Sequence, residues 1–409
     1  MPTLLEDLFR PTDAKPKVKI RTPPLIDVTP DRYGLTVRFR PIPGVGLDEF
    51  DAKLPHLRNY WGMARAKVDQ PENRVIRVRA VRTDPLVKRM ELPGPIRLPS
   101  HFAFCPIGIS DHGETVTAQI ASSTGVGIYG APRWGKTSLT LGILSSLAQY
   151  EEFQFVLADG KTSTGWEGDY YDMGHRCLAV IGDDPAEYNK LIQAVEAIRV
   201  DRQSRIRKEL GVPNLWDVGP SPDWPVLVVV IDEAHSYFEQ VSPASTKELK
   251  DRNALAADNA YRTARTVKLC GSVGIWFIIT TQKPTSDAIP TTIRANLTQG
   301  ICLGVREETV AVAALGEGIK DYPDAMPTQY MTQRYKGCAT TVSEHEPGFT
   351  RFRIPFCSPS VAARTALETR DLITGHLDRY PLPVGQAHLE LAPASPAALM
   401  PADDAETVE

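Results

Sequence analysis

The sequence predicts an α/β protein in which a small α+β domain precedes a larger domain built on a parallel sheet. Three observations support this prediction. From about residue 101, short apolar runs alternate with longer helix-like segments, as expected when crossover helices join parallel strands. The run VLVVVI at 226–231 is apolar throughout, which is typical of a central strand covered on both faces. A glycine-containing segment, GIYGAPRWGKTSLT at 127–140, lies between an apolar run and a helix-like one.

Length and composition indicate a multidomain protein without a strong overall charge. The chain has 409 residues, 42% of them hydrophobic, so two or three domains are expected. Lys and Arg total 46 against 50 Asp and Glu, a net charge of -4, so a nucleic-acid partner needs a local basic surface. The six cysteines occur singly, without a Cys-x-x-Cys pair, which favours reduced thiols over a zinc site or disulfides.

The sequence shows no signal for membrane insertion or export. The longest apolar run, VLVVVI, is much shorter than the roughly 20 residues of a membrane span. The N-terminus, MPTLLEDLFRPTDAKPKVK, carries charges where a signal peptide has an apolar stretch. We therefore expect a cytoplasmic protein with no transmembrane segment, which would reach a membrane only through a partner.

The first part of the chain is expected to hold an arm and a small domain. Residues 1–30 are rich in Pro and Lys and predict a flexible arm, and residues 31–95 predict the α+β domain. In this domain GLTVRFR and RVIRVRAVR alternate like half-buried strands. Between them, residues 46–68 predict a helical segment broken at Pro55. The arginines of the two strands share faces, which leaves open a basic stripe or a solvated sheet face.

Residues 96–358 predict the parallel-sheet domain. A hairpin at 106–120 leads into it. A C-terminal helix is expected within 359–380, and the Ala/Pro-rich acidic tail, 381–409, is expected to be disordered. The strands are predicted at 125–129, 153–159, 177–182, 225–235, 273–282 and 300–305, and the helices at 136–150, 184–210 and 245–269.

The glycine-containing segment fits G-x-x-x-x-G-K-[ST] and lies between a strand and a helix, as a Walker A loop or P-loop must. Its two glycines let backbone amides wrap around a triphosphate, and the helix N-terminus adds a partial positive charge. Lys136 is expected to reach the β- and γ-phosphates of ATP, and the Thr137 hydroxyl to ligate Mg²⁺. The predicted ATP-binding residues are Gly130, Ala131, Pro132, Arg133, Trp134, Gly135, Lys136, Thr137 and Ser138.

Two later strands end in residues that complete a hydrolytic site. Asp232 and Glu233 follow the run VLVVVI, and a Walker B strand ends in such a pair. Asp232 is expected to hold the Mg²⁺ shell, and Glu233 to polarise the attacking water. Gln282 follows the strand FIITT, and a polar residue there faces the ligand crevice of an open α/β sheet. It is placed to sense the γ-phosphate or orient water, although a turn-capping role is also open.

Together these motifs resemble the FtsK/SpoIIIE family of double-stranded DNA translocases, including relatives in actinobacterial conjugative transfer. The resemblance covers roughly residues 31–350. Besides the P-loop, it rests on GISDHGETVTAQI, on LADGK with Asp159 and Lys161, and on AIRVDRQSRIRKELGVPNL, IDEAHSYF, GIWFIITTQKP and DAIPTTIRANL. It implies a RecA-like motor domain that forms a homohexameric ring around duplex DNA. ATP would lie between subunits and be completed by a neighbour's arginine, and residues 31–95 would add a second tier.

The chain departs from the family pattern at the arginines. Gly271 stands where the family has an arginine before its sensor strand, and Gly300 and Gly304 replace arginines around the next strand. The neighbour-contacting arginine therefore cannot be carried over from the family. The candidates for this arginine finger are Arg294, Arg265 and Arg262, each of which could instead be an ordinary surface arginine.

A motor that moves over any sequence should contact phosphates only, because base contacts carry the sequence information. Arg199, Arg202 and Arg205 share one face of a predicted helix and are candidate DNA contacts. They could also contact a neighbouring subunit or lie on a solvated face.

Three functions remain open at this point. The leading hypothesis is an ATP-driven translocase of double-stranded DNA, in DNA transfer or in chromosome or plasmid handling. The first alternative is a secretion-type motor ATPase that translocates protein. The second is a nucleotide-gated DNA-binding scaffold, against which Glu233 speaks because binding alone does not need a base.

Overall fold

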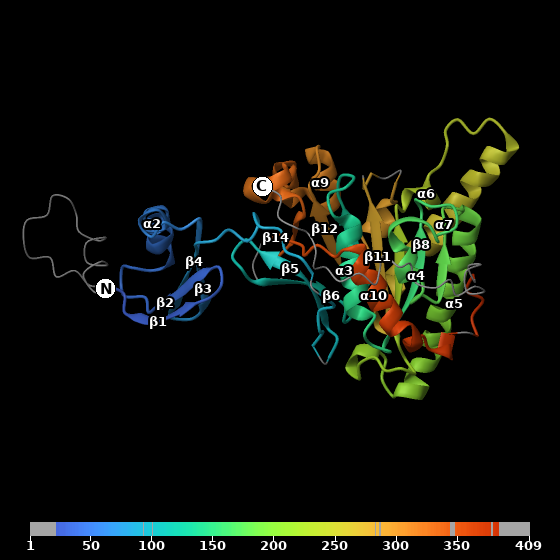
Figure 1. The fold of residues 1–409 in the computed structure, drawn as a ribbon, viewed down its shortest axis with the longest axis horizontal. Coiled ribbons are helices and arrows are strands. Elements are labelled where there is room, and N and C mark those ends of the chain that lie inside the picture. Colours follow the sequence, from blue (N-terminus) through green and yellow to red (C-terminus); the bar gives the residue numbers. More distant parts are fainter. Residues whose placement is uncertain are drawn as a thin grey trace, which may run out of the picture. The chain divides into compact units, whose positions relative to one another are not determined.

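The chain divides into two compact units in the computed structural model. One unit contains residues 1–88 and 109–114, and the other contains residues 89–108 and 115–409. Most of the predicted arm and most of the predicted tail lie outside the described residues. The structure describes residues 22–92, 94–99, 101–282, 284–285, 288–343, 348–377 and 379–383 (Figure 1).

The described residues of the first unit form an antiparallel sheet of four strands with one helix against it. Its strand order is β1-β2-β4-β3, and the alternation in β2 buries Val37 and Phe39 against Phe50 of the helix. The predicted α+β domain is therefore present. The elements are β1 (Leu25–Pro30), β2 (Gly34–Phe39), α2 (Leu47–Tyr60), β3 (Arg65–Glu72) and β4 (Val75–Val81).

Three details of this unit differ from the sequence-based expectation. Strand β1 begins at Leu25, inside the segment predicted as a flexible arm, and β3 occupies the end of the segment predicted to be helical. Helix α2 also continues through Pro55 instead of breaking there. Pro55 is exposed, so the carbonyl that loses its partner faces water, while Phe50 and Leu57 anchor the helix on the buried side.

The described part of the second unit is built on one mixed sheet of ten strands, in the order β6-β5-β14-β13-β12-β7-β11-β10-β8-β9. The six strands from β12 to β9 pair in parallel, which confirms the predicted parallel α/β core. The antiparallel strands β13 and β14, which the sequence analysis missed, extend it toward the predicted hairpin. The strands are β5 (Phe104–Ser110), β6 (Thr115–Gln119), β7 (Gly125–Tyr129), β8 (Phe153–Asp159), β9 (Ala179–Ile181), β10 (Val226–Asp232), β11 (Ile275–Thr281), β12 (Gln299–Leu303), β13 (Cys338–Val342) and β14 (Phe349–Arg353).

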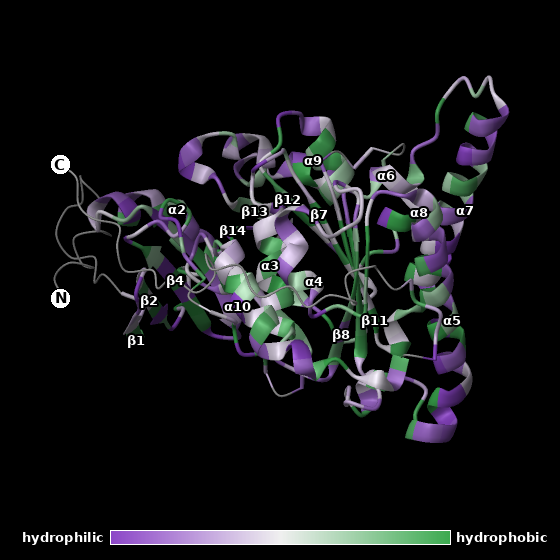
Figure 2. Cartoon of the chain, turned by 45° about the vertical axis from the view of Figure 1, so that its right-hand side comes forward, coloured by the Kyte–Doolittle hydropathy of each residue, from purple (hydrophilic) through white to green (hydrophobic). Residues whose placement is uncertain are grey.

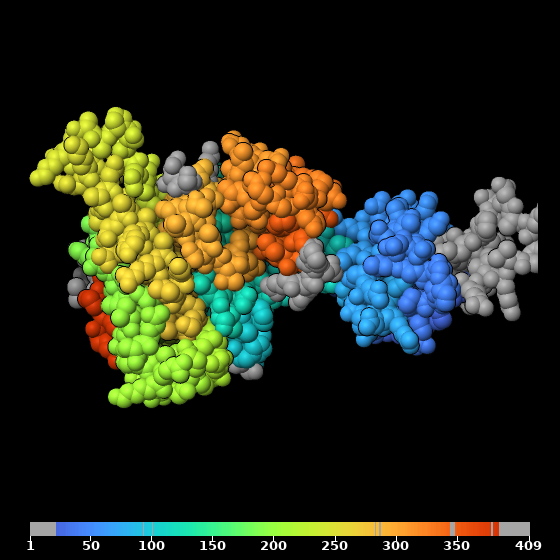
Figure 3. Space-filling view, turned by 180° about the vertical axis from the view of Figure 1, so that it is seen from behind, coloured from blue at the N-terminus to red at the C-terminus, as the bar shows by residue number. Residues whose placement is uncertain are grey.

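Helices cover both faces of this sheet and enclose two apolar clusters. Helices α3, α4 and α10 pack on one face, and α5, α7 and α9 on the other, so the strands lie between them as a hydrophobic layer (Figure 2). The loop before α7 and the first turns of that helix project from the rest of the unit (Figure 3). The helices are α3 (Lys136–Leu147), α4 (Tyr171–Gly174), α5 (Pro185–Leu210), α6 (His235–Phe238), α7 (Lys247–Leu269), α8 (Thr291–Arg294), α9 (Glu308–Leu315) and α10 (Pro359–Thr369).

The period-two alternation along the central strands decides which residues reach the site. In β10, Val226, Val228 and Val230 face α3, while the intervening residues face α5. Asp232 continues the first series and Thr280 continues the matching series in β11, so both side chains lie on the α3 side. No helix within the described ranges is long and apolar enough to cross a lipid bilayer.

Candidate functional site

The P-loop connects β7 to α3 at the carboxyl edge of the parallel strands. Gly135 has φ 114°, a left-handed conformation that favours glycine, and a Cβ there would lie 2.9 Å from Ile354 Cδ1. A Cβ on Gly130 would lie 2.9 Å from Leu303 Cβ. Both glycines of the motif are therefore required by the close packing of the loop against β12 and the end of β14.

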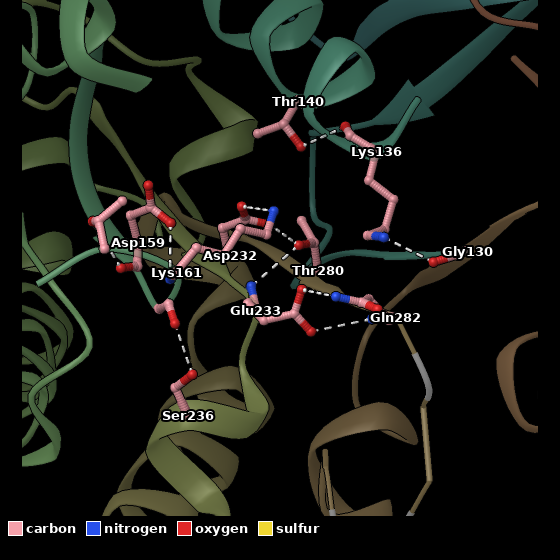
Figure 4. A network of polar contacts seen from close by, with 12 residues as sticks. Gly130, Lys136, Thr140, Asp159, Lys161, Asp232, Glu233, Ser236, Thr280 and Gln282 are labelled. Carbon is pink, nitrogen blue, oxygen red and sulfur yellow. Dashed lines mark hydrogen bonds and ion pairs between the residues drawn. The ribbon is translucent and has the colours of Figure 1, made fainter. Parts of the chain in front are cut away.

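The Lys136 side chain folds back over the P-loop. Its Nζ donates to the carbonyl of Gly130 at 2.8 Å (Figure 4). Burial lowers the pKa of this lysine to about 8, while the nearby Glu233 carboxylate opposes the shift. The ammonium is thus held inside the loop, where a bound phosphate would find a largely desolvated positive charge.

Asp232 ends β10 as a fully buried carboxylate with two partners. Lys161 Nζ lies 2.6 Å from its Oδ2, and the Thr280 hydroxyl donates to its Oδ1 (Figure 4). Asp159 lies opposite Asp232 in the register of β8 and β10. Burial and the charge of Asp232 raise the pKa of Asp159 to about 6. Two carboxylates and one ammonium therefore share this edge of the sheet.

Glu233 is held in place by one residue that directly follows the adjacent strand β11 and by another at the start of α6. The Gln282 side chain donates from Nε2 to Glu233 Oε2 at 3.1 Å, and the Gln282 backbone N–H donates to Oε1 at 3.4 Å. His235 Nδ1 lies 3.0 Å from the same Oε1. Glu233 itself has φ 50°, an uncommon value for a residue other than glycine. The structure thus brings together Glu233 and Gln282, which lie far apart in the sequence.

Three residues of the predicted ATP-binding loop have hydrogen-bond partners elsewhere in the chain. The Ser138 hydroxyl accepts from the backbone N–H of Cys357 at 2.8 Å, which ties α3 to the segment before α10. Trp134 Nε1 donates to the carbonyl of Tyr330 at 3.2 Å. The Ala131 backbone N–H donates to the carbonyl of Gly304 at 2.9 Å. These contacts brace the loop from outside, while Thr137 remains partly exposed at its end.

Two of the three glycines that stand where an arginine was expected, Gly300 and Gly304, have a steric explanation. A Cβ on Gly304 would lie 1.9 Å from Trp134 Nε1, and one on Gly300 would lie 2.5 Å from the carbonyl oxygen of Ala314. No larger side chain fits at either position without displacing its neighbours. The tryptophan in the P-loop and the glycine at 304 therefore depend on each other.

The three candidate arginine fingers differ in how fully their charge is compensated. Arg262 pairs with Asp258 and Glu196, each at 2.8 Å, and Arg265 pairs with Glu196 at 3.2 Å. Arg294 donates instead to the backbone carbonyl of Ala313 at 2.7 Å. No carboxylate among the described residues pairs with Arg294, and its Nε is buried without a hydrogen-bond partner. Its side chain lines a cavity of about 260 Å³ together with Tyr129, Thr291, Ala295, Leu297, Gln299, Gly300, Ala313, Ala314 and Gly316.

The predicted DNA-contacting face of α5 requires a correction. Arg202 is buried and donates to the carbonyls of Val273, Gly274 and Pro225 at 2.8–3.0 Å. Burial lowers the pKa of Arg202 to about 10. Arg199 is buried as well. Helical spacing correctly grouped these side chains on one face, but that face packs inward.

Arg205, the third member of the predicted DNA-contacting group, is only partly buried. It pairs with Asp201 at 2.6 Å and with Glu209 at 2.5 Å, so two carboxylates neutralise its charge. Of the three predicted DNA-contacting arginines, two are therefore buried and the third is neutralised by carboxylates.

Sequence reasoning gave no role at this site to Lys161 and overlooked Thr280. Lys161 was noted only as part of LADGK, and its position next to Asp232 depends on the register of β8 with β10. Thr280 was detectable from alternation alone, because it is the last even-numbered residue of β11 and lies on the same face as Asp232.

The P-loop strand β7 and the Asp-Glu strand β10 are separated by one strand, β11, whose end carries polar side chains. This arrangement defines a P-loop NTPase with a RecA-like core. Comparison with solved structures confirms this fold. The chain is similar to the pCW3 conjugation coupling protein TcpA, in its monomer form with ATPγS, with a TM-score of 0.53 at 14% identity over 86% of this chain and 94% of that chain. It is also similar to EssC (ATPases 2 and 3) from Geobacillus thermodenitrificans, with a TM-score of 0.50 at 16% identity over 72% of this chain and 53% of that chain.

Sequence comparison confirms the predicted resemblance to FtsK/SpoIIIE proteins. The chain is 23% identical to the transfer protein TraSA of Streptomyces ambofaciens over 94% of this chain and 92% of TraSA. It is 25% identical to the DNA translocase FtsK of Oceanobacillus iheyensis and 22% identical to the DNA translocase SpoIIIE of Bacillus subtilis. Each of these two matches covers 52% of this chain but only 27% of the relative. No profile of a known protein family matches the chain.

Proposed function

We propose that the protein is an ATP-driven motor that moves double-stranded DNA in a DNA-transfer process. The observation that carries this proposal is the fixed position of the Glu233 carboxylate. Gln282, at the end of the strand beside the P-loop strand, donates from its Nε2 to Glu233 Oε2 at 3.1 Å. A protein that only binds nucleotide has no need for a carboxylate fixed in this way. Similarity to a transfer protein over 94% of the chain supports a role in transfer, and similarity to two DNA translocases supports DNA as the substrate.

ATP would bind with its phosphates in the P-loop, next to Lys136 and the N-terminus of α3. The residues available for Mg²⁺ are the Thr137 hydroxyl and the Asp232 carboxylate, both hard oxygen donors of the kind that this ion prefers. No group of three or more His, Cys, Asp or Glu side chains in the described ranges could hold a metal by itself. This fits an ion that completes its coordination with nucleotide phosphates and supplies charge neutralisation there.

Glu233 would accept a proton from the attacking water. Gln282 and His235 keep its carboxylate oriented, because both contact its oxygens. Gln282 also lies between the base and the P-loop strand, where its amide would respond to a γ-phosphate. These roles belong to one chain, so a neighbouring subunit would have to supply only the arginine.

The remaining element is a neighbour's arginine in a homohexameric ring. We assign this role to Arg294 among the three candidates, because its charge has no carboxylate partner among the described residues while Glu196 and Asp258 neutralise the other two. An uncompensated guanidinium beside a cavity is suited to accept an anionic group such as a phosphate oxygen.

The motor proposal is tested by measuring ATP turnover with and without linear duplex DNA. We expect strong stimulation by duplexes of unrelated sequence, with a steep salt dependence. Stimulation by a protein substrate alone would favour the secretion-type motor. Tight ATP binding without turnover would favour the scaffold.

The Arg294 assignment is tested by mixing two variants. Arg294→Ala subunits keep an intact P-loop, and Lys136→Ala subunits keep the arginine, so a mixed ring contains some complete interfaces. We expect each variant alone to be inactive and the mixture to recover part of the turnover. Arg265→Ala serves as the matched control and should remain active by itself. An active Arg294→Ala protein would contradict the assignment.

A further inference from the structure

Lys161 occupies one oxygen of the carboxylate that the proposed site would offer to Mg²⁺. Its ammonium lies 2.6 Å from Asp232 Oδ2, and the Thr280 hydroxyl takes the other oxygen (Figure 4). Asp232 is completely buried, whereas the side chain of Lys161 remains 35% exposed. The partner that compensates the buried charge is therefore the one that can move toward solvent.

The backbone that carries Lys161 is fastened to the same edge of the sheet. The Lys161 backbone N–H donates to Asp159 Oδ1 at 3.1 Å, and the Gly160 N–H donates to the carbonyl of Asp232 at 3.0 Å. The Ser236 hydroxyl donates to the carbonyl of Gly160 at 2.8 Å. A Cβ on Gly160 would lie 2.8 Å from the Glu233 carbonyl oxygen, so this loop approaches β10 closely. The attachment point is fixed, and only the four-carbon side chain has freedom.

A buried carboxylate needs a compensating positive charge, since an uncompensated one strongly destabilises a folded protein. Lys161 provides that charge in this structure. A divalent cation at Asp232 would provide it as well, but the two positive charges would repel each other at such a short separation. Lys161 and a metal are therefore competitors for one carboxylate.

We propose that Lys161 is a positioning residue that acts as the resident counter-ion of Asp232 and excludes Mg²⁺ unless nucleotide phosphates arrive with it. This inference rests on the proposed function, because it assumes that Asp232 belongs to the metal shell. The triphosphate brings enough negative charge to offset the repulsion, so metal and nucleotide enter together. Lys161 then turns toward solvent or toward the neighbouring Asp159.

The test measures binding of Mn²⁺ alone, by electron paramagnetic resonance, to the full chain without nucleotide. We expect Lys161→Met to bind Mn²⁺ about tenfold tighter than the unchanged protein, because a like charge has been removed from the metal site. Adding Mg²⁺ alone should also raise the melting temperature of Lys161→Met while leaving that of the unchanged protein constant. Lys161→Arg keeps the charge and should restore the original behaviour. Lys161→Gln gives a second reading if the methionine variant folds poorly.

Lys320→Met is the matched control, because it removes a lysine that pairs with Glu317 at 2.5 Å on the surface. Introducing Asp232→Asn into the Lys161→Met protein should abolish the gain in metal affinity. If Lys161→Met and Lys161→Gln bind Mn²⁺ no tighter than Lys320→Met, the counter-ion role is overturned while the proposed function stands. If the unchanged protein does not bind ATP with Mg²⁺, both proposals fail.

Discussion

Two regions of this chain hold carboxylate side chains in opposite solvent environments. At the carboxyl edge of the larger sheet, Asp232 and Glu233 are buried. Their carboxylates accept hydrogen bonds from side chains that follow the neighbouring strands. On the open face of the N-terminal sheet, a row of four side chains crosses all four strands in register. The row consists of Asp27, Arg38, Arg77 and Asp69.

The two regions differ in the number of groups that compensate each side-chain charge. In the N-terminal row every arginine has its own aspartate, and Arg38 and Arg77 remain 43% and 31% exposed, so water screens each pair. This favours the solvated-face alternative over a basic stripe. At the buried edge one charge is compensated by several groups, and removing any of them leaves the others unpaired. Substitutions should therefore have large and specific effects at the buried edge and small effects on the open face.

The largest effect is expected from Lys136→Ala. Removal of the ammonium inside the P-loop should reduce ATP binding and turnover by at least about 100-fold, because a desolvated charge contributes most to phosphate binding. Equilibrium binding of a fluorescent ATP analogue and phosphate release measure the two effects. Lys320→Ala should change neither. Binding by Lys136→Ala at near-normal affinity would show that the loop holds no phosphate.

The lowered pKa of Lys136 adds a pH dependence to this prediction. Below pH 8 the side chain is charged, and above it the neutral form increasingly dominates. ATP affinity should therefore weaken as pH rises through about 8. Binding above that pH should take up a proton, which calorimetry in buffers of different ionisation enthalpy detects.

Glu233→Gln should lower turnover by about 10²–10⁴-fold and leave ATP binding in place. The amide is similar in size and can still contact Gln282 and His235, but it cannot accept a proton from water. Single-turnover hydrolysis separates the chemical step from binding. Glu239→Gln, an exposed glutamate close in sequence, is the control. Normal hydrolysis by Glu233→Gln would remove the base from this position.

Arg202→Ala should affect stability and not the interaction with DNA. Its guanidinium satisfies three backbone carbonyls at the starts of β10 and β11, so we expect a loss of about 3 kcal/mol in the free energy of unfolding. Urea unfolding measures this loss, and Arg205→Ala on the same helix should lose much less. A weaker duplex affinity at unchanged stability would restore the original DNA-contact prediction.

The contrast between these regions also explains how far the sequence could be interpreted. The parallel strands of the larger sheet were predictable because runs such as VLVVVI are apolar throughout, and the candidate residues Lys136, Asp232 and Glu233 lie in local motifs. Strands β13 and β14 were missed because their sequences, CATTV and FTRFR, contain polar residues. The buried Thr340 and Thr341 bond to the carbonyls of Ala325 and Gly300, and no local pattern indicates such partners.

Contacts between distant segments were equally invisible to local patterns. The Lys161–Asp232 pair depends on strand register, and the Trp134–Gly304 contact joins the P-loop to the end of β12. The orientation of α5 was misjudged for a related reason. Spacing shows which arginines share a face, but only tertiary packing decides whether carbonyls or water receive their hydrogen bonds.

The smallest effect is expected from Arg77→Ala in the N-terminal row. Arg77 pairs with Asp69 across β4 and β3 at 2.5 Å, but both side chains retain contact with water. The loss in unfolding free energy should be about 1 kcal/mol or less and should shrink further in high salt. Urea unfolding at two salt concentrations measures it, with Lys53→Ala, an exposed lysine of α2, as the control. A loss as large as that of Arg202→Ala, independent of salt, would mean that the row is not screened by solvent, and the contrast between the two regions would no longer hold.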